Sequence, residues 1–447
     1  MLDFIHRRVV QPLVALKRGS RHLDYLAELE RSQYDSAEAI AARQLAMLRI
    51  TVKHAWDTVP YYRRVWAAAG LHPDGVKSLA DLQAFPVLTK ADIRTHNAEL
   101  LSTTADPKTC RVKTTSGSTG VPLRIVLDEQ GAQWKTAITL RSDEWSGWRR
   151  GQVAAKVWGN PEYRHQGLRG RLRNAIVDRA IYLDTIQLND ARILDFVEKL
   201  RRNKPGLIFG HAHSLYLVAC RMKALRIVDV RPYGIISTAM PLHAWQRTVI
   251  EEIFGTKATD RYGCEEVSLI ASECEQHNGL HTAAESIFTE VEADGKLLVT
   301  DLSNFAMPLI RYRIGDVVTP PTGICRCGRG LPLLGKVQGR EADYVLTPAG
   351  NLISGISLTE NFAMLIPNTA QLQVIQETRT HLRLRLVKDG DFSDAARRKI
   401  AQLVRELFGP TMTHAVEFVD SIPQEAGGKY RFCISNVAVE YLKELSA

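Results

Sequence analysis

The amino-acid sequence predicts an α/β protein with two parts. The first is a large N-terminal domain, built from parallel-sheet layers and a β-rich subdomain; the second is a small α+β C-terminal domain. Three observations predict this: short apolar segments alternate with helical patterns in the middle of the chain, strands with tight turns follow, and the pattern changes again after residue 340. Strand–helix–strand units of this length favour right-handed crossovers and a largely parallel sheet.

Residues 1–105 are predicted to be a mostly helical entry segment. Apolar side chains recur at helical spacing at the very start, at Leu2, Ile5, Val9, Leu13 and Leu16. We expect Pro12 to break or kink this helix. Because basic residues flank the apolar positions, the helix could lie on a membrane surface. Packing of the helix on its own domain is the interpretation that we favour.

The middle of the chain supplies the predicted parallel sheet. We expect strands over 153–158, 206–209, 234–237 and 257–262, with helices over 214–225 and 244–254. From 287 to 313 the pattern changes to strands with tight turns, and Asp294-Gly295 indicates a hairpin.

The last part of the chain reads as a compact α+β unit. Residues 371–377 and 381–387 are predicted to form paired strands, 394–408 an amphipathic helix and 415–420 a further strand. We place the boundary near 339–343, which gives a large domain over 1–339 and a small one over 340–447.

Composition limits the functional classes. A chain of 447 residues that is 45% hydrophobic and 24% charged is not disordered as a whole. No apolar run approaches the roughly 18–20 residues of a membrane span, and we recognise no signal peptide, so a cytoplasmic location is expected. Seven cysteines argue against a disulfide framework. The net charge of +9 favours acidic partners, but no basic–aromatic pattern indicates nucleic acid.

A loop rich in hydroxyls and glycine is the sharpest local motif. It consists of Thr115, Ser116, Gly117, Ser118, Thr119 and Gly120. Glycine permits close backbone approach, and consecutive N–H groups make an anion-binding concavity. The loop has no lysine and is not a Walker motif. Taken alone, it also fits an ordinary surface loop.

Four further motifs follow this loop in order: YGCEE at 262–266, YRIGD at 312–316, GREAD at 339–343 and GGK at 427–429. Together with the loop, they resemble the adenylate-forming superfamily. The segments VPYYRRVWAAAG, FPVLTKADIR, ECEQHNGLH, MPLIRYRIGD and CRCGRGLP resemble its phenylacetate–CoA ligase-like branch, which includes CapK-type proteins. This resemblance implies an AMP-forming acid–thiol ligase that uses ATP and Mg²⁺.

The resemblance also implies roles for individual residues. The loop would hold the β- and γ-phosphates, and Glu266 would bind Mg²⁺. Tyr262, followed by Gly263, would stack on adenine, Asp316 would hold the ribose hydroxyls, and Arg340 would contact the nucleotide.

The small domain is implied to be a mobile lid. Lys429 would bridge the acyl carboxylate and the α-phosphate, and Asp343 would be the hinge. A carboxylic acid would become an acyl-adenylate and then a thioester with coenzyme A or the phosphopantetheine of a carrier protein. Two alternatives stay open: amide formation with an amine, and a non-catalytic scaffold of a polysaccharide pathway.

The chain departs from the family pattern at three places. Glu265 stands where relatives often have Ser or Thr, and Thr238-Ala239-Met240 stands where many have Thr-Gly-Glu. The loop lysine of many members is missing, and Arg124 is the residue that could replace its charge.

The resemblance also implies an acyl pocket between the predicted strands at 206–209 and 234–237. Its candidate residues are Trp158, Phe209, His211, His213 and Thr238. An aromatic pocket with one or two polar groups fits an aryl or arylacetic acid.

Cysteines and histidines near the β-rich section suggest a structural zinc site. The expected ligands are Cys274, His281, Cys325 and Cys327, with His277 as the substitute for His281. Zinc prefers four sulfur or nitrogen ligands in a closed tetrahedral site. Cys264 is expected to pack rather than to act as a nucleophile.

Overall fold

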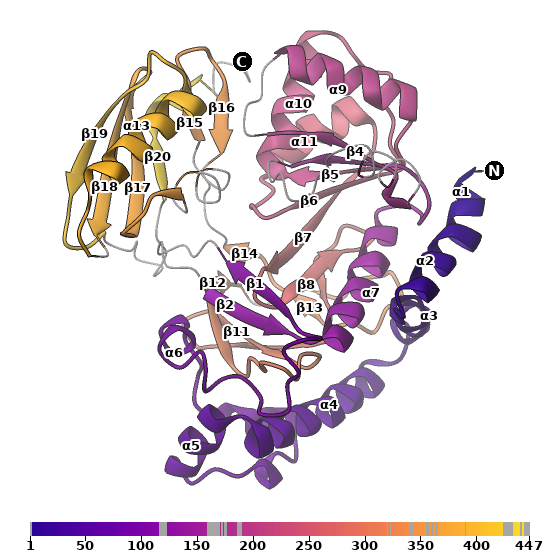
Figure 1. Ribbon diagram of the computed structural model, residues 1–447. Helices are drawn as coiled ribbons and strands as arrows, with labels where there is room; N and C mark the ends of the chain where they lie inside the picture. The colour runs from indigo at the N-terminus through magenta and orange to yellow at the C-terminus, as the bar shows by residue number, and fades with distance from the viewer. Residues whose placement is uncertain are drawn as a thin grey trace. The chain divides into compact units, whose positions relative to one another are not determined.

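The computed structural model describes most of the chain (Figure 1). The described residues are 2–115, 123–158, 170, 173, 177–185, 190–319, 321, 323–338, 344–354, 358, 362, 365–388, 390–422, 432–438 and 440–441. The chain divides into two compact units. The first comprises Met1–Thr115, Leu123–Gly151 and Thr259–Gly339, and the second Ser116–Pro122, Gln152–Ala258 and Arg340–Ala447.

Helices open the first unit, as the sequence predicts. They are α1 (Leu2–Ile5), the π-turn η1 (His6–Val10), α2 (Gln11–Lys17), α3 (His22–Ser32), α4 (Ala37–Thr58), α5 (Pro60–Ala68), the short 3₁₀ turns η2 (Pro73–Gly75) and η3 (Leu79–Ala84), and α6 (Lys90–Thr95). The longest, α4, begins where the side chain of Ser36 accepts a hydrogen bond of 3.2 Å from the backbone N–H of Ala39.

Pro12 does not break the first helix. The π-turn η1 immediately precedes α2, and Pro12 stands in the first turn of α2. A proline has no N–H, and its ring clashes with the carbonyl group four residues earlier in a regular α-helix. The wider π-turn is therefore the form that the expected interruption takes.

Antiparallel strands complete the first unit. A hairpin joins β1 (Arg111–Thr115) to β2 (Leu123–Leu127), and α7 (Glu129–Trp145) follows it. One group pairs in the order β13 (Leu333–Leu334), β9 (Leu280–Thr282), β8 (Ser268–Glu273), β7 (Ala258–Cys264). A four-stranded sheet has the order β10 (Ile287–Val291), β11 (Lys296–Asp301), β12 (Tyr312–Val318), β14 (Val337–Gln338). Gly295, at φ 81°, turns the predicted β10–β11 hairpin.

Parallel strands form the sheet of the second unit, as predicted. Their order is β6 (Gly234–Thr238), β5 (Leu207–His211), β3 (Ala154–Val157), β4 (Ala180–Leu183). The accompanying helices are α9 (Asp190–Asn203), α10 (Ala212–Ala224) and α11 (Ala244–Phe254). Apolar side chains from both kinds of element, such as Val157, Phe196 and Ile235, are fully buried in one core.

The C-terminal part of the second unit is α+β, also as predicted. Its sheet has the order β19 (Thr413–Phe418), β18 (His381–Lys388), β17 (Thr369–Thr378), β20 (Cys433–Ser435). A two-stranded ribbon, β15 (Tyr344–Leu346) and β16 (Leu352–Ser354), precedes it. Helix α13 (Asp394–Phe408) has the predicted bounds because Ser393 caps its first turn and Gly409 ends it. The predicted boundary at 339–343 lies outside the described residues.

Candidate functional site

Strands β7 and β12 bring two predicted nucleotide-binding side chains together. The hydroxyl of Tyr262 donates a hydrogen bond of 2.6 Å to Oδ2 of Asp316. Burial raises the pKa of Tyr262 well above its ordinary value, and the charge of Asp316 raises it further. The phenol therefore stays protonated and donates. Two strands from different sheets thus present the aromatic ring and the carboxylate that are expected to bind the nucleotide.

The predicted magnesium ligand lies in the turn between β7 and β8. Glu266 is only 8% exposed, and its Oε1 accepts a hydrogen bond of 3.0 Å from the hydroxyl of Tyr312 on β12. Because Tyr312 is fully buried, its hydroxyl is held in place and orients the carboxylate of Glu266. One carboxylate beside phosphate oxygens is the kind of ligand set that Mg²⁺ takes.

Gly263 keeps this turn tight. A Cβ built on Gly263 would lie 2.5 Å from the carbonyl oxygen of Ser268, and the β7–β8 register shifts between Tyr262 and Gly263. Only glycine permits that approach. The neighbouring Cys264 is a neutral thiol, because burial raises its pKa well above the ordinary value and Glu266 adds to the shift. This agrees with the expected packing role.

The segment expected to bind phosphate, residues 116–120, lies in the chain between the two strands of the β1–β2 hairpin. Thr115 ends β1 and is paired with Leu123, the first residue of β2, so the loop ends are held beside each other. Several predicted residues lie outside the described part of the chain: Ser116, Gly117, Ser118, Thr119, Gly120, Arg340, Asp343 and Lys429.

A lysine on β1, which belongs to none of the sequence motifs, lies next to the Glu266 turn. Lys113 donates a hydrogen bond of 3.2 Å from Nζ to the hydroxyl of Ser268, in the strand that follows the Glu266 turn. Burial lowers the pKa of Lys113, against the attraction of Glu265. Arg124, proposed to replace the loop lysine, is exposed and pairs with Thr114, so it faces the opposite side of the hairpin. Side chains alternate between the two faces of a strand, and this alternation along the strand before the loop was the signal that could have identified Lys113.

The departure at Thr238-Ala239-Met240 has a structural consequence. Ala239 adopts φ 66°, in the left-handed region that glycine tolerates best. The hydroxyl of Tyr344 lies 3.8 Å from the sulfur of Met240.

The predicted acyl-pocket residues gather at the carboxyl end of the parallel strands. His211 on β5 pairs with Thr238 on β6, so their side chains share one face, and Phe209 lies two residues earlier on that face. Trp158 directly follows β3, and its ring lies 3.9 Å from that of His211 and 5.4 Å, stacked, from that of Phe209. Ligands of parallel sheets bind at this end of the strands.

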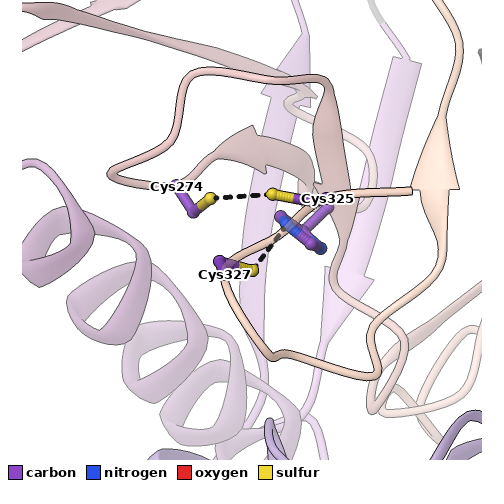
Figure 2. Close-up of side chains that lie close together, drawn as sticks. Cys274, Cys325 and Cys327 are labelled. Carbon is purple, nitrogen blue, oxygen red and sulfur yellow. Dashed lines mark hydrogen bonds between the residues drawn. The ribbon is translucent and has the colours of Figure 1, made fainter. Parts of the chain in front are cut away.

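The four predicted zinc ligands converge in the first unit. One donor atom from each of Cys274, His281, Cys325 and Cys327 lies within 4.8 Å of all the others. Figure 2 shows the side chains of the three cysteines close together. The sulfurs of Cys274 and Cys325 are 3.6 Å apart, and that of Cys327 is 3.3 Å from Nε2 of His281. Three thiols and one imidazole make a donor set that zinc accepts.

Hydrogen-bond partners distinguish the two histidines. Nδ1 of His281 lies 3.1 Å from the carbonyl oxygen of Leu331, to which it can donate, so Nε2 is directed toward the sulfurs. His277 lies instead 3.3 Å from Oε2 of Glu273 and is not part of the group. The substitute ligand is therefore not needed.

Comparisons with known proteins identify one family match and several similar proteins. Residues 345–436 match the family described as CapK C-terminal domain. The chain is 27% identical to a phenylacetate–coenzyme A ligase of Aromatoleum evansii over 347 residues, which is 73% of this chain and 76% of that protein. It is 22% identical to Protein CapK of Staphylococcus aureus over 377 residues, covering 80% and 81%. A 2-hydroxyisobutyryl-CoA ligase, solved with 2-HIB-AMP and CoA in the thioesterification state, shares the fold, with TM-score 0.61, 22% identity and coverage of 93% and 94%.

Proposed function

Because the chain belongs to the adenylate-forming superfamily, in its branch of phenylacetate–CoA ligases and CapK-type proteins, we propose that it activates a carboxylic acid with ATP and transfers the acyl group to a thiol. The acid carboxylate attacks the α-phosphate, pyrophosphate leaves, and an acyl-adenylate forms. The sulfur of coenzyme A then attacks the acyl carbon and displaces AMP. The protein is an AMP-forming acid–CoA ligase.

One observation carries the proposal: β7, β12 and the turn that follows β7 hold Tyr262, Asp316 and Glu266, whose chemistry matches that of a nucleotide and its metal ion. The ring of Tyr262 is proposed to stack on adenine, and its hydroxyl donates a hydrogen bond of 2.6 Å to the carboxylate of Asp316. A carboxylate only accepts hydrogen bonds, and ribose hydroxyls donate them. Glu266, fixed by Tyr312, would hold the Mg²⁺ that shields the phosphates.

Positive charge must offset the meeting of two anions in the first step. We assign part of that charge to Lys113, whose strand leads directly into the loop over 116–120. Lys429 and Arg340 are proposed to supply the rest, and Asp343 is the proposed hinge of the small domain. Backbone N–H groups of the loop would bind the β- and γ-phosphates.

The face formed by Trp158, Phe209, His211 and Thr238 is proposed to receive the acid. Two aromatic side chains on that face favour an aryl or arylacetic acid. Coenzyme A is the proposed acceptor. The phosphopantetheine group of a carrier protein is the alternative acceptor, because it carries the same thiol.

We further propose that Cys274, His281, Cys325 and Cys327 bind one structural Zn²⁺. The sulfur and nitrogen donors come from β9, the segment after β8 and the segment before β13. A metal there would tie these segments together and leave no open position for a substrate.

The test measures AMP formation and ATP–pyrophosphate exchange with a panel of aryl, arylacetic and short aliphatic acids. We expect acid-dependent AMP formation that needs Mg²⁺ and is lost in Lys429→Ala and Glu266→Gln. Thioester formation with coenzyme A should follow. Product in the presence of amines alone would instead support amide formation.

One observation favours the scaffold alternative: Ala239-Met240 stands where many relatives have Gly-Glu. A scaffold that keeps the nucleotide site would bind ATP–Mg²⁺ in calorimetry. It would give no exchange above the Lys429→Ala control with any acid, and that result would contradict the proposed ligase.

A further inference from the structure

His211 is the one histidine among the described residues whose two ring nitrogens are both buried and without a hydrogen-bond partner. Its side chain is almost completely enclosed, at 2% exposure. A buried imidazole without partners costs free energy, because both nitrogens lose the water that they bind in the unfolded chain. Such a residue in an enzyme is explained when a ligand supplies the missing partners.

The position of His211 identifies that ligand. His211 ends β5 and shares a face with Thr238, while Trp158 and Phe209 provide aromatic surface beside it. His211 is also the N-cap residue of α10, yet its side chain makes no capping hydrogen bond. It is therefore directed to the same face as the proposed acid-binding side chains rather than to the helix.

The imidazole of His211 is neutral near pH 7. Burial lowers its pKa to about 4, and no charged group contributes to the shift. A neutral imidazole offers one donor and one acceptor. Its natural complement is a neutral group that also donates and accepts, such as a hydroxyl.

We infer that the acid activated by this protein carries a neutral hydrogen-bonding substituent, a hydroxyl on or near its ring, and that His211 is the specificity-determining residue that binds it. This inference rests on the proposed function of the site. Sites built to hydrogen-bond a substrate hydroxyl reject the analogue that lacks it, because their own buried groups are then left unpaired.

The experiment compares phenylacetate with its three ring-hydroxylated isomers in the AMP-formation assay. We expect one isomer to have kcat/KM about 10- to 100-fold above that of phenylacetate. In His211→Phe, which keeps an aromatic ring beside Trp158, the preference should fall to within about 3-fold, and phenylacetate should be used better than by the unaltered protein. His211→Gln, which retains a donor and an acceptor, should keep most of the preference.

Two failures are distinguishable. If no acid of any class yields AMP, the proposed function itself is wrong. If phenylacetate and all isomers are used within about 3-fold of one another, or if His211→Phe slows all of them equally, the ligase stands and the role of His211 is overturned. Circular dichroism of each variant confirms that it is folded.

A second observation, independent of the active site, concerns the N-terminal helical segment 2–17. Large apolar side chains are exposed along it: Leu2 (71%), Phe4 (66%), Ile5 (42%), Val9 (49%), Leu13 (59%) and Leu16 (78%). No other stretch of that length in the described chain exposes more than three large apolar side chains. The apolar stripe is therefore not the side through which this helix packs on the first unit.

The opposite side of the segment is the one that packs. His6 and Ala15 are buried. A Cβ built on Gly151 would lie 2.5 Å from the carbonyl oxygen of Asp3, so the helix backbone runs directly against that glycine. The apolar stripe is thus held facing outward by contacts on its reverse side.

Charge selects the partner of the stripe. The segment and the residue after it carry Arg7, Arg8, Lys17 and Arg18 against a single acidic residue, Asp3. An apolar face flanked by cations is the pattern of helices that lie in the interface of an anionic bilayer. We propose that residues 2–18 bind an anionic membrane surface in this way. No helix in the described residues is long and apolar enough to cross a membrane.

Vesicle co-sedimentation of the full chain tests this. Vesicles of phosphatidylcholine with about 30 mol% phosphatidylglycerol should bind at least about 10-fold more protein than pure phosphatidylcholine, because each basic residue near the surface adds to the attraction. Leu13→Glu combined with Leu16→Glu should abolish binding. Ile50→Glu, on an exposed position of α4 (52%), is the matched control and should leave binding unchanged. Equal sedimentation of the double variant would overturn the proposal. So would a dimer of the unaltered chain that the double variant dissociates, since a second copy would then cover the stripe.

Discussion

The phenol of Tyr262 and the carboxylate of Asp316, 54 residues apart in the sequence, meet in a hydrogen bond of 2.6 Å. This bond uses one oxygen of the carboxylate and fixes the direction of the other. If Asp316 holds the ribose, Tyr262→Phe leaves the ring for stacking but frees the carboxylate. We expect KM for ATP to rise about 5- to 10-fold with little change in kcat, because this is the effect of losing one hydrogen bond. An unchanged KM in ATP titrations, with Asp316→Ala strongly impaired as the reference, would contradict this.

Lys113 should contribute to phosphate binding although no motif contains it. We expect Lys113→Met to lower the rate of ATP–pyrophosphate exchange about 10- to 100-fold, because the substitution removes a charge-assisted hydrogen bond to phosphate. Arg124→Met is the matched control, since Arg124 pairs with Thr114 and faces the other side of the hairpin. If the two substitutions lowered exchange equally, the effect would come from the loss of one positive charge anywhere on the hairpin and not from the position of Lys113.

The cysteine–histidine group should contain about one zinc per chain. Cys325→Ser combined with Cys327→Ser is expected to reduce zinc to well below half an equivalent and to lower the melting temperature. Cys110→Ser, outside the group, should change neither. Elemental analysis of protein purified without chelators measures the metal, and a zinc-free unaltered protein of full stability would argue against the site.

Ala239 should be a source of backbone strain. Because its φ of 66° lies in the left-handed region, Ala239→Gly is expected to raise the free energy of unfolding by about 1 kcal/mol. Ala67→Gly, in the regular helix α5, should lower it by about the same amount. Urea unfolding gives both values. A destabilised Ala239→Gly would show that the positive φ carries no cost.

Acid should destabilise the second unit through its buried histidines. In the folded chain burial lowers the pKa of His211 to about 4, and the pKa of His213 to about 3 with help from His243. Well above pH 6.5, the ordinary pKa of histidine, these groups are neutral in both states and have no effect. As the pH falls from about 6.5 toward 4, the unfolded state takes up protons that the folded state cannot, so stability decreases. His211→Phe should lose less stability than the unaltered protein between pH 7.5 and 5 in urea titrations.

The order of elements followed from the sequence because it depends on local physics. Helix α13 was predicted with its observed bounds, since its apolar period, its Ser393 cap and the following Gly409 are all local. The β10–β11 hairpin was predicted from Asp294-Gly295 for the same reason. The zinc ligands were predicted from spacing and resemblance, and their convergence within 4.8 Å is a tertiary fact.

By itself, the sequence determined the α/β class, the succession of strands and helices, and the residue types available to a nucleotide and an acid. These follow from hydrophobic periodicity, turn residues and motif order, which act along the chain. Only the tertiary structure decided that Lys113 and not Arg124 lies beside the Glu266 turn, that His281 and not His277 joins the cysteines, and that the first helix turns its apolar stripe outward. Strand register and helix packing make those choices, and they depend on contacts between segments far apart in the chain.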